Sequence, residues 1–373
     1  MSAMARTRRL KLSLWTEGLS ISENAKAYLQ RVNGERPLTP ADYASTSGVI
    51  LKLENDVWVN APLTHYNPNF ISSDPPFVLE FANDGLRVVG RDMDCSARIW
   101  LPPAYHDQKN ENGEYYNDYV FTHADRVRLS PIEGCAMACT FCDLPYKFKY
   151  RTKRISSMID AVQRAISDPI QPAHHVLISG GTPRPEHYAY LNTVYEEVLG
   201  RIDVPVDIMM APVGDLLDVR RLDSLGVREI SVNLELWTES LARTVMPKKH
   251  AQERSHYLNF LEDAASVLGG RRVRSMLIAG LEPIQATLEG VQALAERGVV
   301  PVLSPFRPDP QTPKRNERPP TPAFLEDLFV RASEVADRYG LPLGPGCIPC
   351  SHNTLTFTTG SDYFHAHGVP LVK

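Results

Sequence analysis

Short apolar segments alternate with amphipathic helical patterns over residues 125–340, and this alternation constrains the fold of the 373-residue chain more than any other feature. Strands that alternate with helices build a parallel sheet. Six such units are fewer than a closed eight-unit barrel of about 250 residues requires. We therefore predict an α/β fold, a partial (β/α)6 TIM-type barrel with a lateral opening. The predicted strands are 126–129, 175–179, 206–210, 229–233, 274–278 and 299–304, and the predicted helices are 156–166, 188–199, 216–225, 250–268, 284–297 and 323–339.

Residues 1–124 lack this rhythm and are predicted to form an N-terminal accessory region with some β-structure. A short helix is expected at 22–32, and strands at 49–53, 57–59, 77–81 and 97–101. Residues 125–340 are the predicted barrel, and residues 341–373 are a C-terminal tail that carries cysteines. Both chain ends are expected to cover the lateral opening.

Composition narrows the class of protein. A hydrophobic content of 43% and a charged content of 23% are those of an ordinary soluble globular protein. The net charge of −4 provides no overall field that attracts nucleic acid. No apolar run is long enough to span a bilayer, and residues 8–15 lack the apolar core of a signal peptide. Three of the six cysteines form a tight cluster, which favours a reducing cytoplasm.

Cys135, Cys139 and Cys142 form a C-x3-C-x2-C pattern directly after the first predicted barrel strand. Each thiolate can bind one iron of a 4Fe–4S cluster, and three ligands leave the fourth iron open to a small molecule with an amine and a carboxylate. A structural zinc site normally has four protein ligands, and no fourth Cys or His lies nearby in the sequence. The spacing is too tight for a disulfide framework.

With Phe141 before the last cysteine, this pattern resembles the signature loop of the radical S-adenosylmethionine (SAM) superfamily. The resemblance implies that the cluster binds SAM and that one electron from a ferredoxin or flavodoxin cleaves it. The resulting 5′-deoxyadenosyl radical then abstracts hydrogen from a substrate. It also implies the partial barrel, with the chemistry at the C-terminal ends of the strands.

Further segments resemble the SAM-binding elements of that family, and of biotin and lipoyl synthases in particular. The two glycines of Ser179–Pro183 allow the backbone to approach a ligand closely, although Thr182 replaces the usual Glu. Alternation places Asn233 and Glu235 on one face of the fourth strand. The resemblance assigns amine, ribose, carboxylate and adenine contacts to Phe141, Gly180, Gly181, Thr182, Asn233, Glu235, Arg254 and Ile278.

A second pair, Cys347 and Cys350, follows the last predicted helix. Two-residue spacing suits an auxiliary iron–sulfur cluster, a zinc site with His352, or reduced thiols. The auxiliary cluster is favoured, with Cys95 as a third ligand if the N-terminal region folds back over the barrel. His365 and His367 are candidate outer groups.

Residues 146–154 interleave five basic residues with aromatics immediately after the cysteine loop. The segment suits an anionic small-molecule substrate or an acidic electron donor; without a recognisable RNA-binding module, nucleic acid is not favoured. Arg307 is a second candidate anion contact. No membrane partner is expected.

The resemblance to biotin and lipoyl synthases, with a second cluster, predicts a sulfurtransferase that inserts sulfur from the auxiliary cluster into a biosynthetic intermediate. One alternative is radical epimerisation, dehydrogenation or rearrangement without sulfur transfer. The other is a non-catalytic iron–sulfur sensor or scaffold.

Overall fold

The computed structural model describes residues 2–38, 48–63, 74–269, 271–357 and 371–372. Its larger sheet has seven strands in the order β15-β14-β13-β12-β11-β8-β7. All neighbours from β8 to β15 are parallel, and β7 pairs antiparallel with β8 at one edge. The bounds are β7 Val120–His123, β8 Arg126–Leu129, β11 His175–Ile178, β12 Val206–Met209, β13 Glu229–Ser231, β14 Val273–Ala279 and β15 Val300–Pro305, with a small ladder of β9 Ile132–Glu133 and β10 Arg151–Thr152 beside them.

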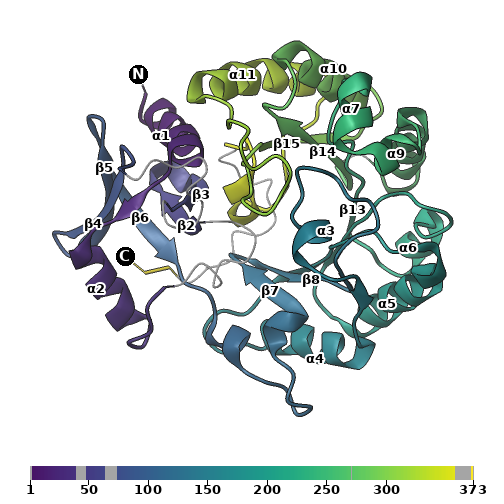
Figure 1. Cartoon of the computed structure of the whole chain (residues 1–373), viewed down its shortest axis with the longest axis horizontal. Helices are drawn as coiled ribbons and strands as arrows, with labels where there is room; N and C mark the ends of the chain where they lie inside the picture. The colour runs from purple at the N-terminus through teal and green to yellow at the C-terminus, as the bar shows by residue number, and fades with distance from the viewer. Residues whose placement is uncertain (1, 39–47, 64–73, 270, 358–370, 373) are drawn as a thin grey trace.

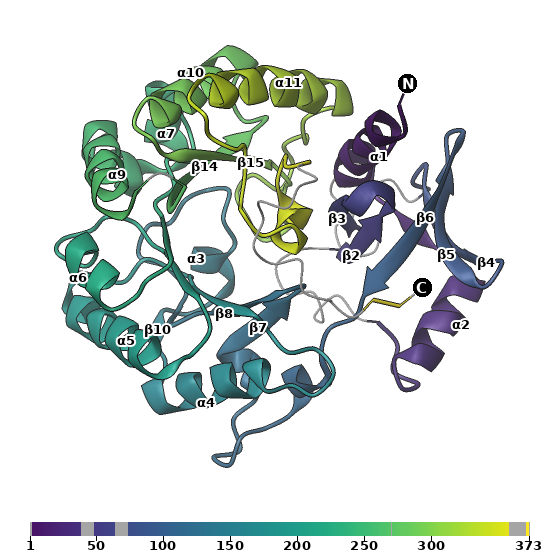
Figure 2. The ribbon, with the colours of Figure 1, turned by 180° about the vertical axis from the view of Figure 1, so that it is seen from behind.

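Helices cover the outer face of this curved sheet, so the predicted partial (β/α)6 barrel is confirmed. Figure 1 and Figure 2 show from opposite sides that the strands form an arc with the helices outside it. The helices of this part are α3 Leu144–Lys147, α4 Ile155–Ile166, α5 Tyr188–Arg201, α6 Val219–Ser224, α7 Glu239–Val245, α8 Pro247–His250, α9 Arg254–Leu268, α10 Ile284–Ala295 and α11 Pro322–Arg338, with the 3₁₀ turns η5 Pro185–His187 and η6 Pro349–Asn353.

Two predicted helices begin later than the sequence pattern indicated. Asp218 caps α6, because its side chain accepts a hydrogen bond from the backbone N–H of Arg221. The residues before Asp218 are consequently a turn. In the next unit, Glu253 adopts φ +61, which separates α8 from α9 and moves the start of the long helix from His250 to Arg254.

The N-terminal region contains a second sheet with the order β1-β4-β5-β6-β2-β3, so the expectation of β-structure here is met. The sequence pattern missed α1 and β5. Helix α1 has no polar stripe over its second half, because Leu10 to Thr16 are all buried. The elements are α1 Ala3–Glu17, β1 Ser20–Ile21, α2 Glu23–Val32, β2 Gly48–Leu53, η2 Glu54–Asp56, β3 Trp58–Pro62, β4 Val78–Ala82, β5 Gly85–Gly90, β6 Met93–Trp100, η3 Ala104–Asp107 and η4 Tyr116–Asp118.

The C-terminal segment 344–356 lies between the two edge strands of the arc. Gly344 and Leu355 donate backbone hydrogen bonds to Pro301 and Leu303 of β15, at 2.8 Å each. On the other side, the His352 ring stacks 6.5 Å from the His123 ring of β7. The lateral opening is thereby filled by the tail of the chain, as expected.

Helix α1 holds this segment from outside. The fully buried Lys11 donates from Nζ to the carbonyls of Ser351 (2.9 Å) and Thr356 (3.1 Å). Trp15 donates from its indole N–H to the carbonyl of His352 (3.2 Å). Helix α1 and the C-terminal segment therefore meet at the open side of the barrel (Figure 1). None of the described helices is long and apolar enough to cross a membrane.

Replacing Lys11 with Met tests this contact. The variant removes the Nζ donor from both carbonyls. The Ser351 carbonyl keeps the N–H of Thr354, whereas the buried Thr356 carbonyl loses the bond from Lys11, and an unsatisfied buried group costs about 1–3 kcal/mol. We expect a lower melting temperature by differential scanning calorimetry. Lys26→Met removes an ammonium whose side chain is 54% exposed, and it should stay within about 0.5 kcal/mol of wild type. Equal losses in both variants would show that the Lys11 contacts do not hold the segment.

Candidate active site

The loop that carries Cys135, Cys139 and Cys142 follows β8 and β9 and packs against the loop that follows β11. A Cβ atom added to Gly181 would lie 1.7 Å from the Gly134 carbonyl oxygen, so the two backbones touch. Gly134 itself has φ +70, a conformation that L side chains rarely adopt. Glycine is therefore required on both sides of this contact.

Segments after β13 fix the other side of the cysteine loop. Thr140 donates from its backbone N–H (2.8 Å) and its hydroxyl (3.1 Å) to the carbonyl of Val245. Lys248 donates from Nζ to the carbonyl of Ala136 (2.8 Å). The loop is thus clamped between the ends of two non-adjacent strands.

The thiols have the environment of metal ligands. Cys135 Sγ accepts backbone N–H bonds from Met137 (3.3 Å) and Thr182 (3.2 Å), which stabilise a thiolate. Burial raises the pKa of Cys139 to about 12, and burial also raises the pKa of Cys142. Because thiolates are the ligands of iron, these two sulfurs need a bound cation to lose their protons.

A pocket with about 610 Å³ of empty space, part of it continuous with solvent, opens beside the loop. Its walls come from the C-terminal ends of β8, β11, β12 and β13, which is where β/α barrels carry their chemistry. The lining residues are Cys135, Met137, Cys139, Phe141, Cys142, Leu144, Ser179, Gly180, Thr182, Met209, Met210, Ala211, Asn233, Glu235 and Lys249. Five of the eight expected SAM contacts lie in this wall, namely Phe141, Gly180, Thr182, Asn233 and Glu235.

Glu235 is held in an unusual conformation at the pocket. Its backbone has φ +68. The Glu235 N–H donates to the carbonyl of Met276 in β14 (2.9 Å), and the Glu235 carbonyl accepts from the N–H of Ile278 (2.8 Å). One carboxylate oxygen pairs with Lys249 Nζ at 3.2 Å, while the other, Oε2, is buried without a hydrogen-bond partner. A buried acceptor in a pocket wall is available to a ligand hydroxyl.

Lys249 is the pocket residue that sequence reasoning missed. It belongs to α8, in the Pro-Lys-Lys-His stretch after the fourth parallel strand. It is the one Lys or Arg side chain in the described pocket wall. The basic stretch beside a strand end was a signal in the sequence for a ligand contact here. The sequence spacing alone does not show which of Lys248 and Lys249 enters the pocket.

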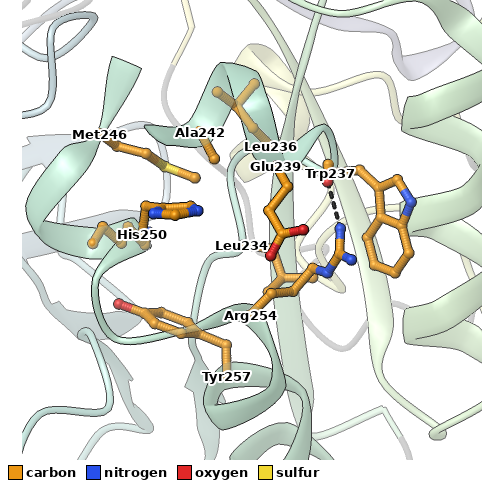
Figure 3. Close-up of a pocket in the computed structure, with 10 residues that line it drawn as sticks. Leu234, Leu236, Trp237, Glu239, Ala242, Met246, His250, Arg254 and Tyr257 are labelled. Atoms are coloured by element: carbon orange, nitrogen blue, oxygen red, sulfur yellow. Dashed lines mark hydrogen bonds between the residues drawn. The ribbon is translucent and has the colours of Figure 1, made fainter. Parts of the chain in front are cut away.

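The remaining expected contacts lie outside this wall. Gly181 forms the contact with Gly134, and Ile278 pairs with the Glu235 backbone. Arg254 lines a neighbouring pocket of about 350 Å³ that shares Lys249 with the first. Figure 3 shows it beside Trp237, whose carbonyl accepts from Arg254 Nη1 at 2.6 Å and whose ring lies 4.1 Å from the guanidinium.

The second cysteine pair lies at the opposite end of the barrel strands. Cys350 Sγ is 3.5 Å from His175 Nε2, at the start of β11, and Cys347 Sγ is 3.8 Å from Asp125 Oδ2, just before β8. Ser179 of the pocket lies four positions after His175, which is roughly 13 Å of extended strand. The two cysteine sites therefore lie at opposite ends of the barrel strands.

The expectation that Cys95 joins this pair is corrected by the structure. Cys95 lies in β6 of the N-terminal sheet, where its thiol contacts the Ser96 carbonyl (3.5 Å). Among the described residues, the third group beside the pair is His175. His352 is turned away, because its Nδ1 contacts the Pro349 carbonyl (2.9 Å) and its Nε2 contacts the Asn353 amide (3.0 Å). His365 and His367 lie outside the described residues.

Much of the charge in the basic segment 146–154 is engaged locally. Arg151 pairs with Glu133, and Arg154 lies 3.6 Å from Glu114. Lys153 donates to the Asp118 carbonyl. Lys147 and Lys149 are exposed.

Arg307 does lie at a barrel end, after β15. It bonds Asn60 of β3 (2.6 Å) and Asn353 of η6 (3.1 Å). It thereby connects the barrel with both accessory parts of the chain.

Comparison with known proteins identifies the central part of the chain. Residues 129–305 match the family model of the Radical SAM superfamily. The bacteriochlorophyllide c C-7(1)-hydroxylase of Chlorobaculum limnaeum is 25% identical over 156 residues, which are 40% of this chain and 38% of that protein. The matched stretch thus spans well under half of this relative's length.

Two solved structures match part of the chain at low TM-scores. The FeFe-hydrogenase maturase HydG of Carboxydothermus hydrogenoformans has a TM-score of 0.46 at 17% identity, over 58% of this chain and 52% of that one. A radical SAM methyltransferase of Sphaerobacter thermophilus has a TM-score of 0.47 at 15% identity, over 74% of this chain and 80% of that one.

Replacing Gly181 with Ala tests the contact between the two loops. The added methyl group would meet the Gly134 carbonyl oxygen, so the cysteine loop must move. We expect iron per chain after anaerobic reconstitution to fall well below about four, with an unchanged far-ultraviolet circular dichroism spectrum.

Gly200→Ala is the matched control, since a Cβ there meets no atom within 4 Å. A Gly181→Ala protein that retains the full iron content would show that the loop contact does not shape the cluster site.

Proposed function

From the radical SAM domain that residues 129–305 represent, we propose an enzyme that abstracts hydrogen from a small-molecule substrate without transferring sulfur. Cys135, Cys139 and Cys142 would hold a 4Fe–4S cluster, and the adjoining pocket would hold SAM. A reduced cluster held by these thiols would supply the electron for cleavage of SAM to methionine and a 5′-deoxyadenosyl radical. The observation that carries the proposal is the convergence of this cysteine loop with Gly180, Thr182, Asn233, Glu235 and Lys249 on one pocket.

The side chains of the pocket suit the polar groups of SAM. The unpartnered Oε2 of Glu235 would accept a bond from a ribose hydroxyl. Lys249 would meet the carboxylate, a role expected of Arg254 from the sequence. Gly180 and Thr182 offer backbone and hydroxyl acceptors for the amine, and the Phe141 segment would lie against adenine.

Arg128 supports an anionic substrate. Its guanidinium lies among Cys142, Asp143 and Arg126, and burial lowers its pKa. Its Nε is buried without a hydrogen-bond partner. A carboxylate or phosphate of the substrate would compensate this charge beside the cluster loop, and the surrounding barrel wall would exclude water.

Sulfur insertion, the reaction favoured from the sequence, needs a sulfide donor that reaches the substrate. The position of Cys347 and Cys350 argues against it, since a strand length of roughly 13 Å separates His175 beside them from the pocket. The hydroxylase that matches part of this chain also acts on carbon without sulfur, by its name. These two observations favour the alternative of hydrogen abstraction followed by another fate of the substrate radical.

The electron donor would dock beside the cysteine loop. Lys147 and Lys149 are exposed within seven residues of Cys142, and ferredoxins and flavodoxins expected as donors would meet them with acidic surfaces. A one-electron carrier bound there would lie close to the cluster.

The proposal predicts reductive cleavage of SAM. Protein reconstituted anaerobically with iron and sulfide should form 5′-deoxyadenosine from SAM when dithionite or reduced flavodoxin is added. The Cys135→Ala/Cys139→Ala/Cys142→Ala variant should form none, and Cys95→Ala should behave as wild type. A wild-type protein that holds about four irons and still leaves SAM intact would favour the sensor or scaffold reading instead.

Sulfide analysis separates the two enzymatic readings. Without sulfur transfer, acid-labile sulfide per chain stays constant through turnover, and the Cys347→Ser/Cys350→Ser variant still cleaves SAM. Loss of sulfide in step with product would restore sulfur insertion.

Lys249→Met should weaken SAM binding. A hydrogen bond to a charged group contributes about 1.5–3 kcal/mol, so we expect the dissociation constant to rise about 10- to 100-fold. Isothermal titration of the reconstituted protein measures it. Arg243→Met, an exposed position on the preceding helix, serves as the control for lost charge. An unchanged dissociation constant in Lys249→Met would remove the lysine from the SAM site.

A further inference from the structure

We propose that Cys347, Cys350 and His175 bind a single tetrahedral metal ion, for which Zn²⁺ is the best fit, and that this ion fastens the C-terminal segment to the floor of the barrel. One sulfur or nitrogen atom from each of the three residues lies within 4.8 Å of the other two, and all three residues are buried. The site is separate from the radical SAM pocket, and it does not depend on the function proposed above.

The separations suit one ion. Zinc–sulfur and zinc–nitrogen bonds of about 2.3 and 2.0–2.1 Å at the tetrahedral angle place S and N about 3.5 Å apart. The distance between Cys350 Sγ and His175 Nε2 is 3.5 Å. In a four-iron cluster each thiolate binds a different iron, which holds the ligand atoms further apart. In the described structure, the sulfur atoms of Cys135, Cys139 and Cys142 do not all lie within 4.8 Å of one another.

The surrounding groups match those of metal sites. Asp125, fully buried, lies with Oδ2 3.6 Å from His175 Nδ1. A carboxylate on Nδ1 fixes the tautomer that presents Nε2 to a metal. Cys347 Sγ accepts the backbone N–H of Cys350 at 3.3 Å, which stabilises a thiolate. Asp125 Oδ1 has no hydrogen-bond partner, so the fourth ligand position goes to this carboxylate or to water.

The charges call for a cation. Two thiolates and a carboxylate are too costly to bury without compensation. The cations that face the group are Arg274, which acts on both thiols, Arg228, which acts on Cys347, and Arg126, which acts on Asp125. A divalent ion would supply the remaining charge.

An ion here would close a loop between distant parts of the chain. It joins the start of β11 to the segment that fills the opening between β15 and β7. That segment also carries Asn353, which bonds Arg307 beside the N-terminal sheet. Loss of the ion would therefore weaken the attachment of the C-terminal segment to the barrel, and it would leave the residues of the radical SAM pocket unchanged.

Metal analysis of the full-length chain tests the proposal. In the Cys135→Ala/Cys139→Ala/Cys142→Ala background, we expect one zinc per chain by inductively coupled plasma mass spectrometry and no acid-labile sulfide. Adding Cys347→Ser/Cys350→Ser or His175→Ala should remove the zinc, whereas adding Cys95→Ser should not. Asp125→Asn should weaken zinc binding about 10- to 100-fold in competition with a chelator.

Cobalt substitution gives a readout that does not require the ligand variants to fold. Co²⁺ added to metal-free protein of the same background should produce the intense visible bands of a tetrahedral thiolate site, and added Zn²⁺ should abolish them. Iron and sulfide in equal amounts at this pair would overturn the proposal in favour of an auxiliary cluster. Absence of both bound zinc and the cobalt spectrum would overturn it in favour of free thiols.

Discussion

The open edge of the barrel is the constraint on which the rest of the structure depends. Six parallel strands and one antiparallel strand form an arc, and an uncovered edge leaves backbone donors and acceptors unpaired. In β15, two edge carbonyls accept hydrogen bonds from the backbone N–H groups of Gly344 and Leu355 in the C-terminal segment. Helix α1 then covers that segment with Lys11, whose Nζ donates to the carbonyls of Ser351 and Thr356.

Strand length keeps the two cysteine groups apart. The loop at the C-terminal ends of the strands places three thiols in the wall of a pocket. At the N-terminal ends, two thiols and an imidazole lie within 4.8 Å of one another, where we propose a single metal ion. Both sites use cysteines at short spacing, so their chemistry is decided by the groups that the fold brings beside them. The Gly134–Gly181 contact makes the first loop, and His175 completes the second site.

Much of this could be predicted from the sequence, because the relevant signals are local. Strand–helix alternation gives the barrel, and Cys135, Cys139 and Cys142 with Gly180 and Asn233 follow strand ends. The missed features depend on tertiary contacts. Helix α1 is buried around most of its circumference and has no amphipathic pattern. Lys249 enters the pocket because of a helix break, and His175 meets Cys350 only after the chain has closed on itself. Cys95 was misassigned for the same reason, since nothing local fixes where the N-terminal sheet packs.

The meeting of helix α1 with residues 344–356 has a consequence for biosynthesis. During translation, the strands of the arc emerge before residues 344–356 do. Until that segment leaves the ribosome, the carbonyls of Pro301 and Leu303 in β15 lack the donors that it supplies. Helix α1, made first, likewise keeps Lys11 without the two carbonyls that it binds in the finished fold.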